Sequence, residues 1–382
     1  MKILIVGAGL SGLLFATLCQ RMGIQYDIFE RSDGSRRSGG VMSINSGILP
    51  ALEQLGIYEK LVEKSYPVFC SNVIDEAIGR KFEIRVKGYK QRTGYNNCIF
   101  SRPDLYDVLL SLVPPERIHY NKRVIQISEY IAGVSIRCSD KQEHHGTLLV
   151  GADGGYSHVR QCLYEDLSAK GLLPPEDSTG FKNPYTTLFG TTDPLPVEDF
   201  KDIGEGYSTF TLSIGKEPYC WTTFTVPGNR ICWTVHKQVL EEEYQSMVFR
   251  KSNWGPEAVD DMVNEVKHLA TGYGATIGTL VSYTSKESMA RVWAEDKVFN
   301  TWHHGRIVLI GDAVHKLLPT AGLGAVNAMQ DAVVLANCLY DLKSLSREQF
   351  DIAFQKYQEL RMPHVMEQYE ASRRQAKFIS NQ

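Results

Sequence analysis

The N-terminal segment constrains the fold of this chain more than any other stretch. Residues 2–6 form a run of β-forming residues that is apolar from Ile3 onward, and it leads directly into Gly7-Ala8-Gly9-Leu10-Ser11-Gly12. Residues 12–22 then carry the apolar stripe of a helix, and residues 26–30 have the composition of a second strand. A strand, a helix and a strand in such a short span predict a right-handed, parallel β-α-β crossover.

The glycine spacing G-x-G-x-x-G has a physical purpose where a strand turns into a helix. Gly7 permits the tight turn, Gly9 lets the backbone approach a pyrophosphate, and Gly12 lets the helix pack closely on the strand. The helix N-terminus offers free N–H groups and a positive dipole to the phosphates. Glu30 ends the second strand, where an acid accepts hydrogen bonds from an adenosine ribose and repels a 2′-phosphate. This pattern predicts a dinucleotide site.

A second glycine- and aspartate-containing segment follows the short apolar run 147–150. It reads Gly151-Ala152-Asp153-Gly154, with Ser157 and Arg160 shortly after it. By itself, this segment is also explained by a turn with an Asx-type cap that ends a strand.

A third segment follows the apolar run 306–310, which is typical of a buried parallel strand. Asp312 comes directly after this run, at the carboxyl end of the strand where open α/β sheets bind ligands. Gly322 and Gly324 precede another predicted helix and would let the backbone approach a flat ring system, although a plain loop also explains them.

The remaining segments predict a second layer and several helices. Residues 171–206 are rich in Pro, Gly and Asp, and the alternating segments nearby predict an antiparallel meander. Its strands are 186–191, 207–214, 219–226 and 230–236. Further strands are predicted at 80–86 and within 122–137, and helices at 46–64, 103–113, 256–270, 324–342 and 347–379.

Composition excludes several classes of protein. The 41 basic and 44 acidic residues leave a net charge of -3, which gives no electrostatic footprint for nucleic acid. No run of about 18 apolar residues is present, so we expect no transmembrane segment. The eight cysteines include no C-x-x-C pair, which favours reduced thiols in a cytoplasmic protein, and no metal site is expected from the spacing of His303-His304.

Taken together, the three glycine- and aspartate-containing segments resemble those of FAD-dependent monooxygenases of the para-hydroxybenzoate hydroxylase type (class A). The stretch from Trp302 to Lys316 is especially similar to fungal secondary-metabolite members, including epoxidases of meroterpenoid and indole-diterpene pathways. The resemblance covers about 200 residues of the FAD-binding halves. It departs where many relatives have Gly-Gln-Gly in place of Gly322-Leu323-Gly324, and where several fungal relatives carry an apolar C-terminal tail.

The resemblance implies an α/β fold: a discontinuous Rossmann-like FAD-binding domain, a substrate domain built on an antiparallel β-sheet, and C-terminal helices. The implied FAD-binding parts are residues 1–66, 96–170 and 291–345. The implied substrate-domain parts are the strands of 67–95 and the antiparallel sheet of 171–290, and 346–382 is the C-terminal helix.

The resemblance also implies cofactor-binding residues. Gly7, Gly9 and Gly12 would hold the FAD pyrophosphate, Glu30 and Arg31 the adenosine end, and Asp312 the ribityl chain. The other implied FAD contacts are Gly40 and Ser43 in a loop near the flavin, Arg102 at a helix start, Asp153 in a D-G motif also associated with the nicotinamide cofactor, and Pro319, Gly322, Gly324 and Ala325 along the isoalloxazine.

The implied activity is a monooxygenase reaction that uses FAD, NAD(P)H as electron donor and O2. A flavin C4a-hydroperoxide would hydroxylate or epoxidise a small, largely apolar or aromatic substrate, behind an apolar wall that excludes water. Candidates for this wall are Phe210, Trp221, Phe224 and Trp233, although ordinary core packing also explains these aromatic residues. No catalytic acid or base is predicted, because a backbone hydrogen bond near the flavin loop is the favoured explanation for His315.

Other classes remain open. A flavin-dependent oxidase, an isoprenoid reductase, or a non-redox FAD-binding cyclase would share the same cofactor residues. A plain NAD dehydrogenase would explain Gly7–Gly12 but not Gly311-Asp312, and a flavin halogenase would need a W-x-W-x-I-P signature that the chain lacks. The oligomeric state, the substrate, the regiochemistry and the choice between NADH and NADPH are not predicted.

Overall fold

The computed structural model describes residues 1–34, 40–76, 78–85, 88–200, 202–215, 218–239 and 256–379. The chain folds into two units, and each unit is assembled from separate stretches of sequence. Unit 1 comprises Met1–Ser35, Tyr106–Lys182 and Asp296–Ser372, and unit 2 comprises Arg36–Leu105, Asn183–Glu295 and Arg373–Gln382. The assignment of residue ranges to an FAD-binding and a substrate domain remains a prediction.

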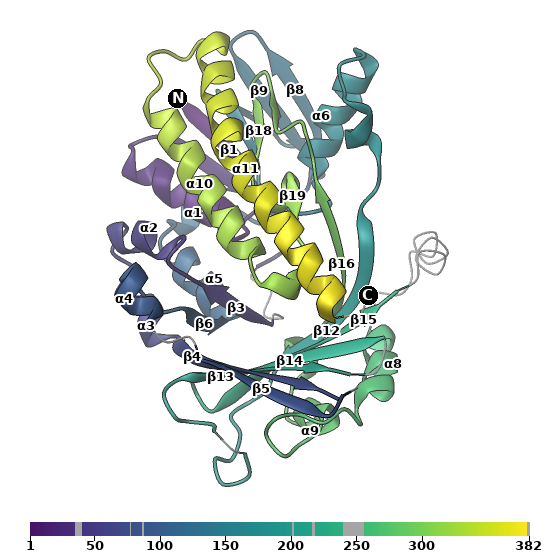
Figure 1. The fold of residues 1–382 in the computed structure, drawn as a ribbon. Coiled ribbons are helices and arrows are strands. Elements are labelled where there is room, and N and C mark those ends of the chain that lie inside the picture. Colours follow the sequence, from purple (N-terminus) through teal and green to yellow (C-terminus); the bar gives the residue numbers. More distant parts are fainter. Residues whose placement is uncertain are drawn as a thin grey trace. The chain divides into compact units, whose positions relative to one another are not determined.

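A six-stranded sheet forms the centre of unit 1 (Figure 1), in the order β17-β18-β11-β1-β2-β7. Its strands are β1 (Lys2–Val6), β2 (Gln25–Phe29), β7 (Ile118–His119), β11 (Leu148–Gly151), β17 (His303–His304) and β18 (Ile307–Leu309). All neighbouring pairs are parallel except β17 with β18. The predicted sharing of one parallel sheet between the N-terminus and the last quarter of the chain is confirmed.

Helices and a smaller sheet complete unit 1. The helices are α1 (Leu10–Arg21), α6 (His158–Ala169), α10 (Gly324–Tyr340) and α11 (Arg347–Ile379), and α10 and α11 run alongside one another (Figure 1). The small sheet contains β8 (Val124–Tyr130), β9 (Gly133–Cys138) and β10 (Glu143–Gly146). Short 3-10 segments lie at Pro115–Arg117, Pro175–Ser178, Gly311–Ala313 and Pro319–Ala321, and β19 is His315–Lys316.

Unit 2 is built on a mixed sheet in the order β16-β12-β15-β14-β13-β4-β6-β3. Its strands are β3 (Val41–Ile44), β4 (Tyr66–Asp75), β5 (Arg80–Arg85), β6 (Cys98–Ser101), β12 (Lys182–Thr191), β13 (Ser208–Ile214), β14 (Tyr219–Val226), β15 (Arg230–Gln238) and β16 (Ala290–Val298), with β5 paired to β4. The antiparallel meander β13-β14-β15 was predicted correctly. The predicted place of the first strand of the meander is wrong, because β12 pairs antiparallel with β15 and not with β13, the next strand in the sequence. The parallel pairing of β13 with β4 was not predicted.

The predicted helix over 46–64 is wrong as a single element. Two short helices occupy this stretch, α2 (Leu49–Gln54) and α3 (Tyr58–Glu63). Between them Gly56 has φ +73°, a left-handed conformation that ends a helix at little cost only for glycine. The other helices of unit 2 are α4 (Tyr89–Thr93), α5 (Arg102–Leu110, which runs on into unit 1), α8 (Pro256–Val266) and α9 (Ile277–Ser282). None of the helices among the described residues is both long and apolar enough to cross a bilayer.

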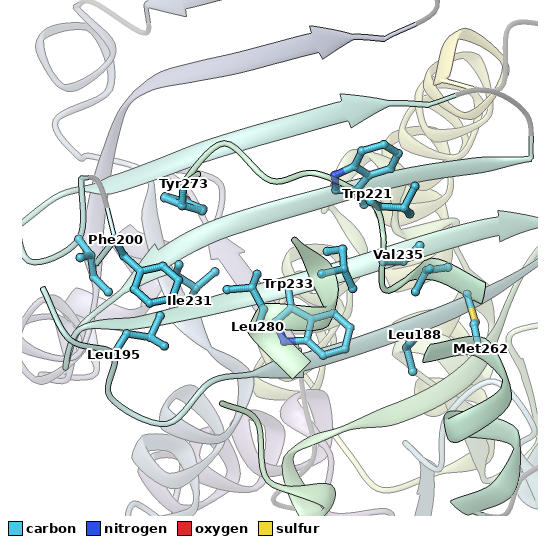
Figure 2. Packing of buried hydrophobic residues seen from close by; sticks show 14 residues of the cluster. Leu188, Leu195, Phe200, Trp221, Ile231, Trp233, Val235, Met262, Tyr273 and Leu280 are labelled. Carbon is cyan, nitrogen blue, oxygen red and sulfur yellow. The ribbon is translucent and has the colours of Figure 1, made fainter. Parts of the chain in front are cut away.

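The unit 2 sheet buries one face in a hydrophobic core that contains Trp221 and Trp233 (Figure 2). These side chains are 1% and 0% exposed, and they pack with residues of α8 and α9 such as Met262 and Leu280. Their indole N–H groups donate to the Ala270 carbonyl at 2.7 Å and to the Thr284 hydroxyl at 3.1 Å. The expectation that Trp221 and Trp233 line a substrate wall is therefore wrong, because both are fully enclosed core residues.

Phe210 and Phe224 lie on the opposite face of the same sheet. Successive side chains of a strand alternate between faces, so the odd-numbered Trp221 and the even-numbered Phe224 of β14 point in opposite directions. Phe210 and Phe224 are directly opposite one another in the β13–β14 pair, and their rings stack at 4.5 Å. This second face, called the Phe224 face below, is only partly covered at these residues.

The Phe224 face also holds a buried histidine. The Nδ1 atom of His236 lies 2.9 Å from the Thr187 hydroxyl, and its Nε2 atom lies 3.5 Å from the Thr234 hydroxyl. Burial lowers the pKa of His236 from 6.5 to about 4, because the imidazolium would lose its hydration. The folded chain therefore keeps this ring neutral in mildly acidic solution.

We expect His236 to make the stability of the protein pH-dependent. The unfolded chain protonates this ring near pH 6.5, whereas the folded chain does so near pH 4. The contribution of the neutral His236 ring to the free energy of unfolding is fully present above pH 6.5. It is lost as the pH falls from 6.5 to 4, by roughly 3 kcal/mol. Urea unfolding of wild type and His236→Gln at pH 7 and pH 4 measures this. If the difference in unfolding free energy between wild type and His236→Gln is the same at both pH values, the prediction is contradicted.

Candidate functional site

The turn between β1 and α1 is packed backbone against backbone. A Cβ atom on Gly12 would lie 2.1 Å from the Gly7 carbonyl oxygen, and one on Gly7 would lie 2.4 Å from the Ala152 carbonyl oxygen. Gly7 has φ +105°, which side-chain-bearing residues rarely adopt. Gly9, in contrast, is exposed and has no atom closer than 4.0 Å to its Cβ position. The turn therefore presents open backbone at Gly9 in front of the first turn of α1.

Glu30 follows β2 and holds this turn in place. Its carboxylate accepts hydrogen bonds from the backbone N–H groups of Ala8 at 3.0 Å and Ser32 at 2.9 Å. Burial would raise the pKa of Glu30, but these hydrogen bonds bring its pKa below the ordinary value, so the carboxylate is ionised at neutral pH. Arg31, beside it, is exposed. A negative charge at this strand end suits recognition of ribose hydroxyl groups.

Asp153 lies at the end of β11 and caps helix α6. Its carboxylate accepts hydrogen bonds from the Ser157 hydroxyl and from the backbone N–H groups of His158 at 2.7 Å and Val159 at 3.1 Å. This is the capping geometry that the sequence also allowed. Both carboxylate oxygens are thus occupied, and a role of Asp153 in binding FAD or the nicotinamide cofactor remains a prediction.

Arg160 joins two of the loops that the sequence singled out. Its guanidinium donates to the Ala313 carbonyl at 2.7 Å and to the Gly155 carbonyl at 2.8 Å, and it stacks on the Phe299 ring at 4.1 Å. The loop after β11 and the loop after β18 are therefore fixed relative to one another. The sequence marked Arg160 by its spacing from Asp153 but gave no sign of these partners.

The loop after β18 carries an exposed carboxylate. Asp312 is exposed, whereas its neighbours Gly311 and Ala313 are buried. A Cβ atom on Gly311 would lie 3.0 Å from the Ser11 hydroxyl of α1 and 3.1 Å from Ala328 of α10. The starts of α1 and α10 and the Asp312 loop thus meet within unit 1.

The first turn of α10 is open on the side of its glycines. Nothing lies within 4 Å of the Cβ positions of Gly322 and Gly324, and Gly322 has φ +64°. Pro319 is exposed, and Ala325 is partly exposed. Neither α1 nor α10 has a side-chain hydrogen bond at its N-cap, so their first N–H groups can serve a ligand.

The remaining predicted cofactor residues lie in unit 2. Antiparallel pairing of β3 with β6 places Val41 opposite Ser101, and the Arg102 N–H donates to the Gly40 carbonyl at 2.9 Å. Ser43 is opposite Ile99 in the same pair. The Gly40 loop and the start of α5 are thus one structural element. Gly39, which belongs to the same sequence motif, lies outside the described residues.

The residues of unit 1 fit FAD. The turn holds no Cβ at Gly7 or Gly12 and leaves open backbone at Gly9. Together with two helix starts without side-chain caps and an exposed carboxylate, it matches a pyrophosphate joined to a ribityl chain. The parallel sheet and these loops define a dinucleotide-binding protein.

Comparison with known proteins identifies the dinucleotide. Residues 1–182 and 240–372 match the family described as FAD binding domain, and the chain belongs to this family. It is 31% identical to the FAD-dependent monooxygenase atmM of Aspergillus flavus, over 97% of this chain and 77% of that protein. It is 28% identical to the FAD-dependent monooxygenase paxM of Penicillium paxilli, over 99% and 78%. The chain is thus a flavin-dependent monooxygenase, as the sequence motifs predicted.

Solved structures share the fold at low sequence identity. Klebsiella pneumoniae HpxO, complexed with FAD and uric acid, matches with a TM-score of 0.78 at 20% identity, over 100% of this chain and 89% of that chain. The 2,6-dihydroxypyridine-3-hydroxylase of Arthrobacter nicotinovorans matches with a TM-score of 0.77 at 20% identity, over 99% and 92%. At this identity the likeness establishes the fold alone.

We expect Gly12→Ala to remove bound FAD. Its methyl group would displace the Gly7 carbonyl, and such an overpacked position costs about 1–3 kcal/mol. The ratio of flavin absorbance to protein absorbance in the purified variant measures the loss. Gly180→Ala is the matched control, because nothing lies within 4 Å of that Cβ position and its φ is not left-handed. Retention of full flavin content by Gly12→Ala would show that the turn is not the cofactor cradle.

Proposed function

We propose that the protein uses NAD(P)H and O2 to hydroxylate or epoxidise a small, largely apolar or aromatic substrate. The observation that carries this proposal is the composition of the Phe224 face of the unit 2 sheet. Aromatic and aliphatic side chains form much of that face, and a glycine loop from the predicted flavin-binding set lies on it. Bound FAD would supply the electron transfer and the O2 activation, and the chain must supply binding, orientation and exclusion of water.

The proposed cofactor roles follow the positions described above. Gly7, Gly9 and Gly12 would hold the pyrophosphate, Glu30 and Arg31 the adenosine end, and Asp312 the ribityl hydroxyl groups. The remaining proposed FAD contacts are Gly40, Ser43, Arg102, Asp153, Pro319, Gly322, Gly324 and Ala325. Open space at Gly322 and Gly324 and the ionised, structurally fixed Glu30 support these roles.

The Phe224 face supports an apolar substrate. Strand register aligns Phe224 with Phe210, and Thr222 with Leu212, across β14 and β13. The same rows continue through β4 to β5, where Phe82 and Ile84 are 45% and 55% exposed. Exposed apolar side chains in a continuous row commonly mark a binding surface.

Gly40 connects this face to the cofactor loop. A Cβ atom on Gly40 would lie 3.5 Å from both Phe189 and Thr234, so the backbone of the loop rests directly on the sheet. The Thr234 hydroxyl also lies within hydrogen-bond distance of the Thr222 hydroxyl. We propose that Phe224 and Phe210 hold the apolar body of the substrate and keep water from the reacting groups.

The eight cysteines support a cytoplasmic location for the protein, which we also propose. All eight are free thiols in the structure, and six of them are buried. Burial raises the pKa of Cys19 and of Cys220, so these thiols stay protonated and unreactive at neutral pH. Reduced thiols in this number are usual where disulfides do not form.

A coupled assay tests the proposed activity. NADPH oxidation and O2 consumption by the purified holoprotein are measured against phenols and prenylated alkenes, with product masses. Equal consumption of NADPH and O2 and a product heavier by one oxygen atom support a monooxygenase. Hydrogen peroxide without an oxygenated product indicates an oxidase, NADPH use with a saturated product indicates a reductase, and bound FAD that neither NADH nor NADPH reduces indicates a non-redox role.

We expect Asp312→Ala to lose FAD while the chain stays folded. The Asp312 side chain is exposed, so its removal should not disturb the packing of the fold. The variant would lose a charge-assisted hydrogen bond to the cofactor, which is worth about 1.5–3 kcal/mol. Flavin fluorescence after dilution gives the FAD dissociation constant, and circular dichroism reports folding. The control is Asp166→Ala, which removes an exposed carboxylate paired with Lys170 on α6. Equal FAD content in both variants would refute the assignment.

We expect Phe224→Val to change substrate selectivity without loss of FAD. The substitution enlarges the space beside Phe210, so bulkier substrates should gain in kcat/KM relative to smaller ones, by roughly tenfold or more per added methylene group. The matched control is Trp233→Phe on the buried face, which should lower the unfolding free energy and leave the selectivity ratio unchanged. If Trp233→Phe shifts selectivity and Phe224→Val does not, the substrate face has been misassigned.

A further inference from the structure

A buried carboxylate lies in the middle of α10. The Asp331 side chain is 0% exposed, and an ionised carboxyl group at such a position is costly unless it is paired. Its Oδ2 atom accepts a hydrogen bond from the Gly311 backbone N–H at 2.8 Å and lies 2.6 Å from His315 Nε2. Its Oδ1 atom accepts from Arg361 Nε at 2.7 Å. These partners bring the pKa of Asp331 below its ordinary value, although burial alone would raise the pKa.

Arg361 comes from the next helix, α11, and its side chain is only 4% exposed. Besides Asp331, its guanidinium donates to Asn327 Oδ1 at 2.9 Å and to the Asn327 carbonyl at 3.3 Å. Asn327 in turn donates through its side-chain amide to the carbonyl of Leu323, the N-cap residue of α10, at 3.0 Å. Figure 1 shows α10 and α11 running side by side, which is the arrangement these hydrogen bonds require.

The partners of this network belong to two loops. Gly311 and His315 bracket Asp312, and Leu323 lies between Gly322 and Gly324. The two loops are those that we propose to hold the ribityl chain and the isoalloxazine ring. Neither Asp331 nor Arg361 needs to contact the cofactor to affect it, because both act on the backbone that presents the contacting residues.

We propose that Asp331 and Arg361 are positioning residues for FAD, which fix the Gly311–His315 loop and the start of α10 in their binding conformation. The proposal rests on the proposed assignment of Asp312, Gly322 and Gly324 to the flavin site. A loop held in its bound conformation before the ligand arrives binds more tightly, because less conformational entropy is lost on binding.

Simple helix packing does not require this arrangement. An apolar pair of similar volume holds two helices together as well as, or better than, a buried ion pair. What an apolar pair lacks is direction: the Asp331 carboxylate accepts from one loop with Oδ2 and from α11 with Oδ1. The network therefore transmits the position of α11 to the Asp312 loop, and α11 becomes part of the cofactor site without lining it.

The test compares FAD release and loop protection in the full chain. The variants are Asp331→Asn, Arg361→Met and Arg361→Lys, with Phe354→Leu as the matched control. Phe354 lies two turns before Arg361 on α11 and is buried, and its ring packs against Phe350 and His303, so its change disturbs the same helix through residues outside the Asp331 network. Recovery of flavin fluorescence on dilution of the holoprotein gives the FAD dissociation constant. Hydrogen exchange of peptides covering residues 311–316, with and without FAD, reports the loop directly.

We expect the FAD dissociation constant to rise about tenfold or more in Asp331→Asn and Arg361→Met, the loss typical of one charge-assisted hydrogen bond. Arg361→Lys keeps the charge and should fall between these variants and wild type. Phe354→Leu should stay within about twofold of wild type. Exchange at residues 311–316 should be faster in Asp331→Asn than in Phe354→Leu, also without FAD.

Several outcomes would overturn the proposal. FAD affinity equal to that of wild type in Asp331→Asn and Arg361→Met would do so. An equal loss of affinity in Phe354→Leu would do so as well, because it would indicate a general packing effect. If a single variant does not fold, the double variant Asp331→Asn/Arg361→Gln removes both buried charges together and takes its place. If wild type itself fails to bind FAD, the proposed function falls, whereas unchanged exchange at 311–316 overturns the positioning role alone.

Discussion

The close approach of three backbone segments at the carboxyl ends of β1, β11 and β18 governs the construction of unit 1. Gly7 sits against the Ala152 carbonyl, Gly12 sits against the Gly7 carbonyl, and Gly311 sits against α1 and α10. No Cβ fits at Gly7 or Gly12, and one at Gly311 would be tight, so the positions of α1, α10 and the Asp312 loop are determined together. Asp312 is exposed on this loop, between the buried Gly311 and Ala313.

Features of unit 1 that depend on residues close together in the sequence could be predicted. The sequence correctly predicted the strand Lys2–Val6, the glycine turn after it and the strand before Asp312. It could do so because the spacing of apolar residues and of glycines is a local property of the sequence. In unit 2 the same reasoning found β5 and the strands β12 to β15, but it did not find β3, β6 or β16, and it did not find the faces of the strands or all their partners. The parallel pairing of β13 with β4 joins residues far apart in the sequence, and no local pattern specifies it.

The faces of the unit 2 sheet show why aromatic residues alone do not identify a substrate site. Trp221 and Phe224 are three residues apart and were treated alike, yet strand alternation places them on opposite faces. Which face becomes the core depends on α8 and α9, which cover Trp221 and Trp233. The Asp331 network was missed for a similar reason: an Asp and an Arg in amphipathic helices have the pattern of surface charges, and only the packing of α10 on α11 buries them.

The two units are subject to different constraints, and this difference bears on how the family can change its substrates. Unit 1 holds its proposed cofactor residues through backbone contacts and buried charges, where substitutions at Gly12 or Asp331 have few tolerable alternatives. The sheet of unit 2 is held by backbone pairing, which is indifferent to the side chains on its partly exposed face. Phe210 and Phe224 can therefore be replaced without disturbing the strands, provided that Trp221 and Trp233 keep the opposite face filled.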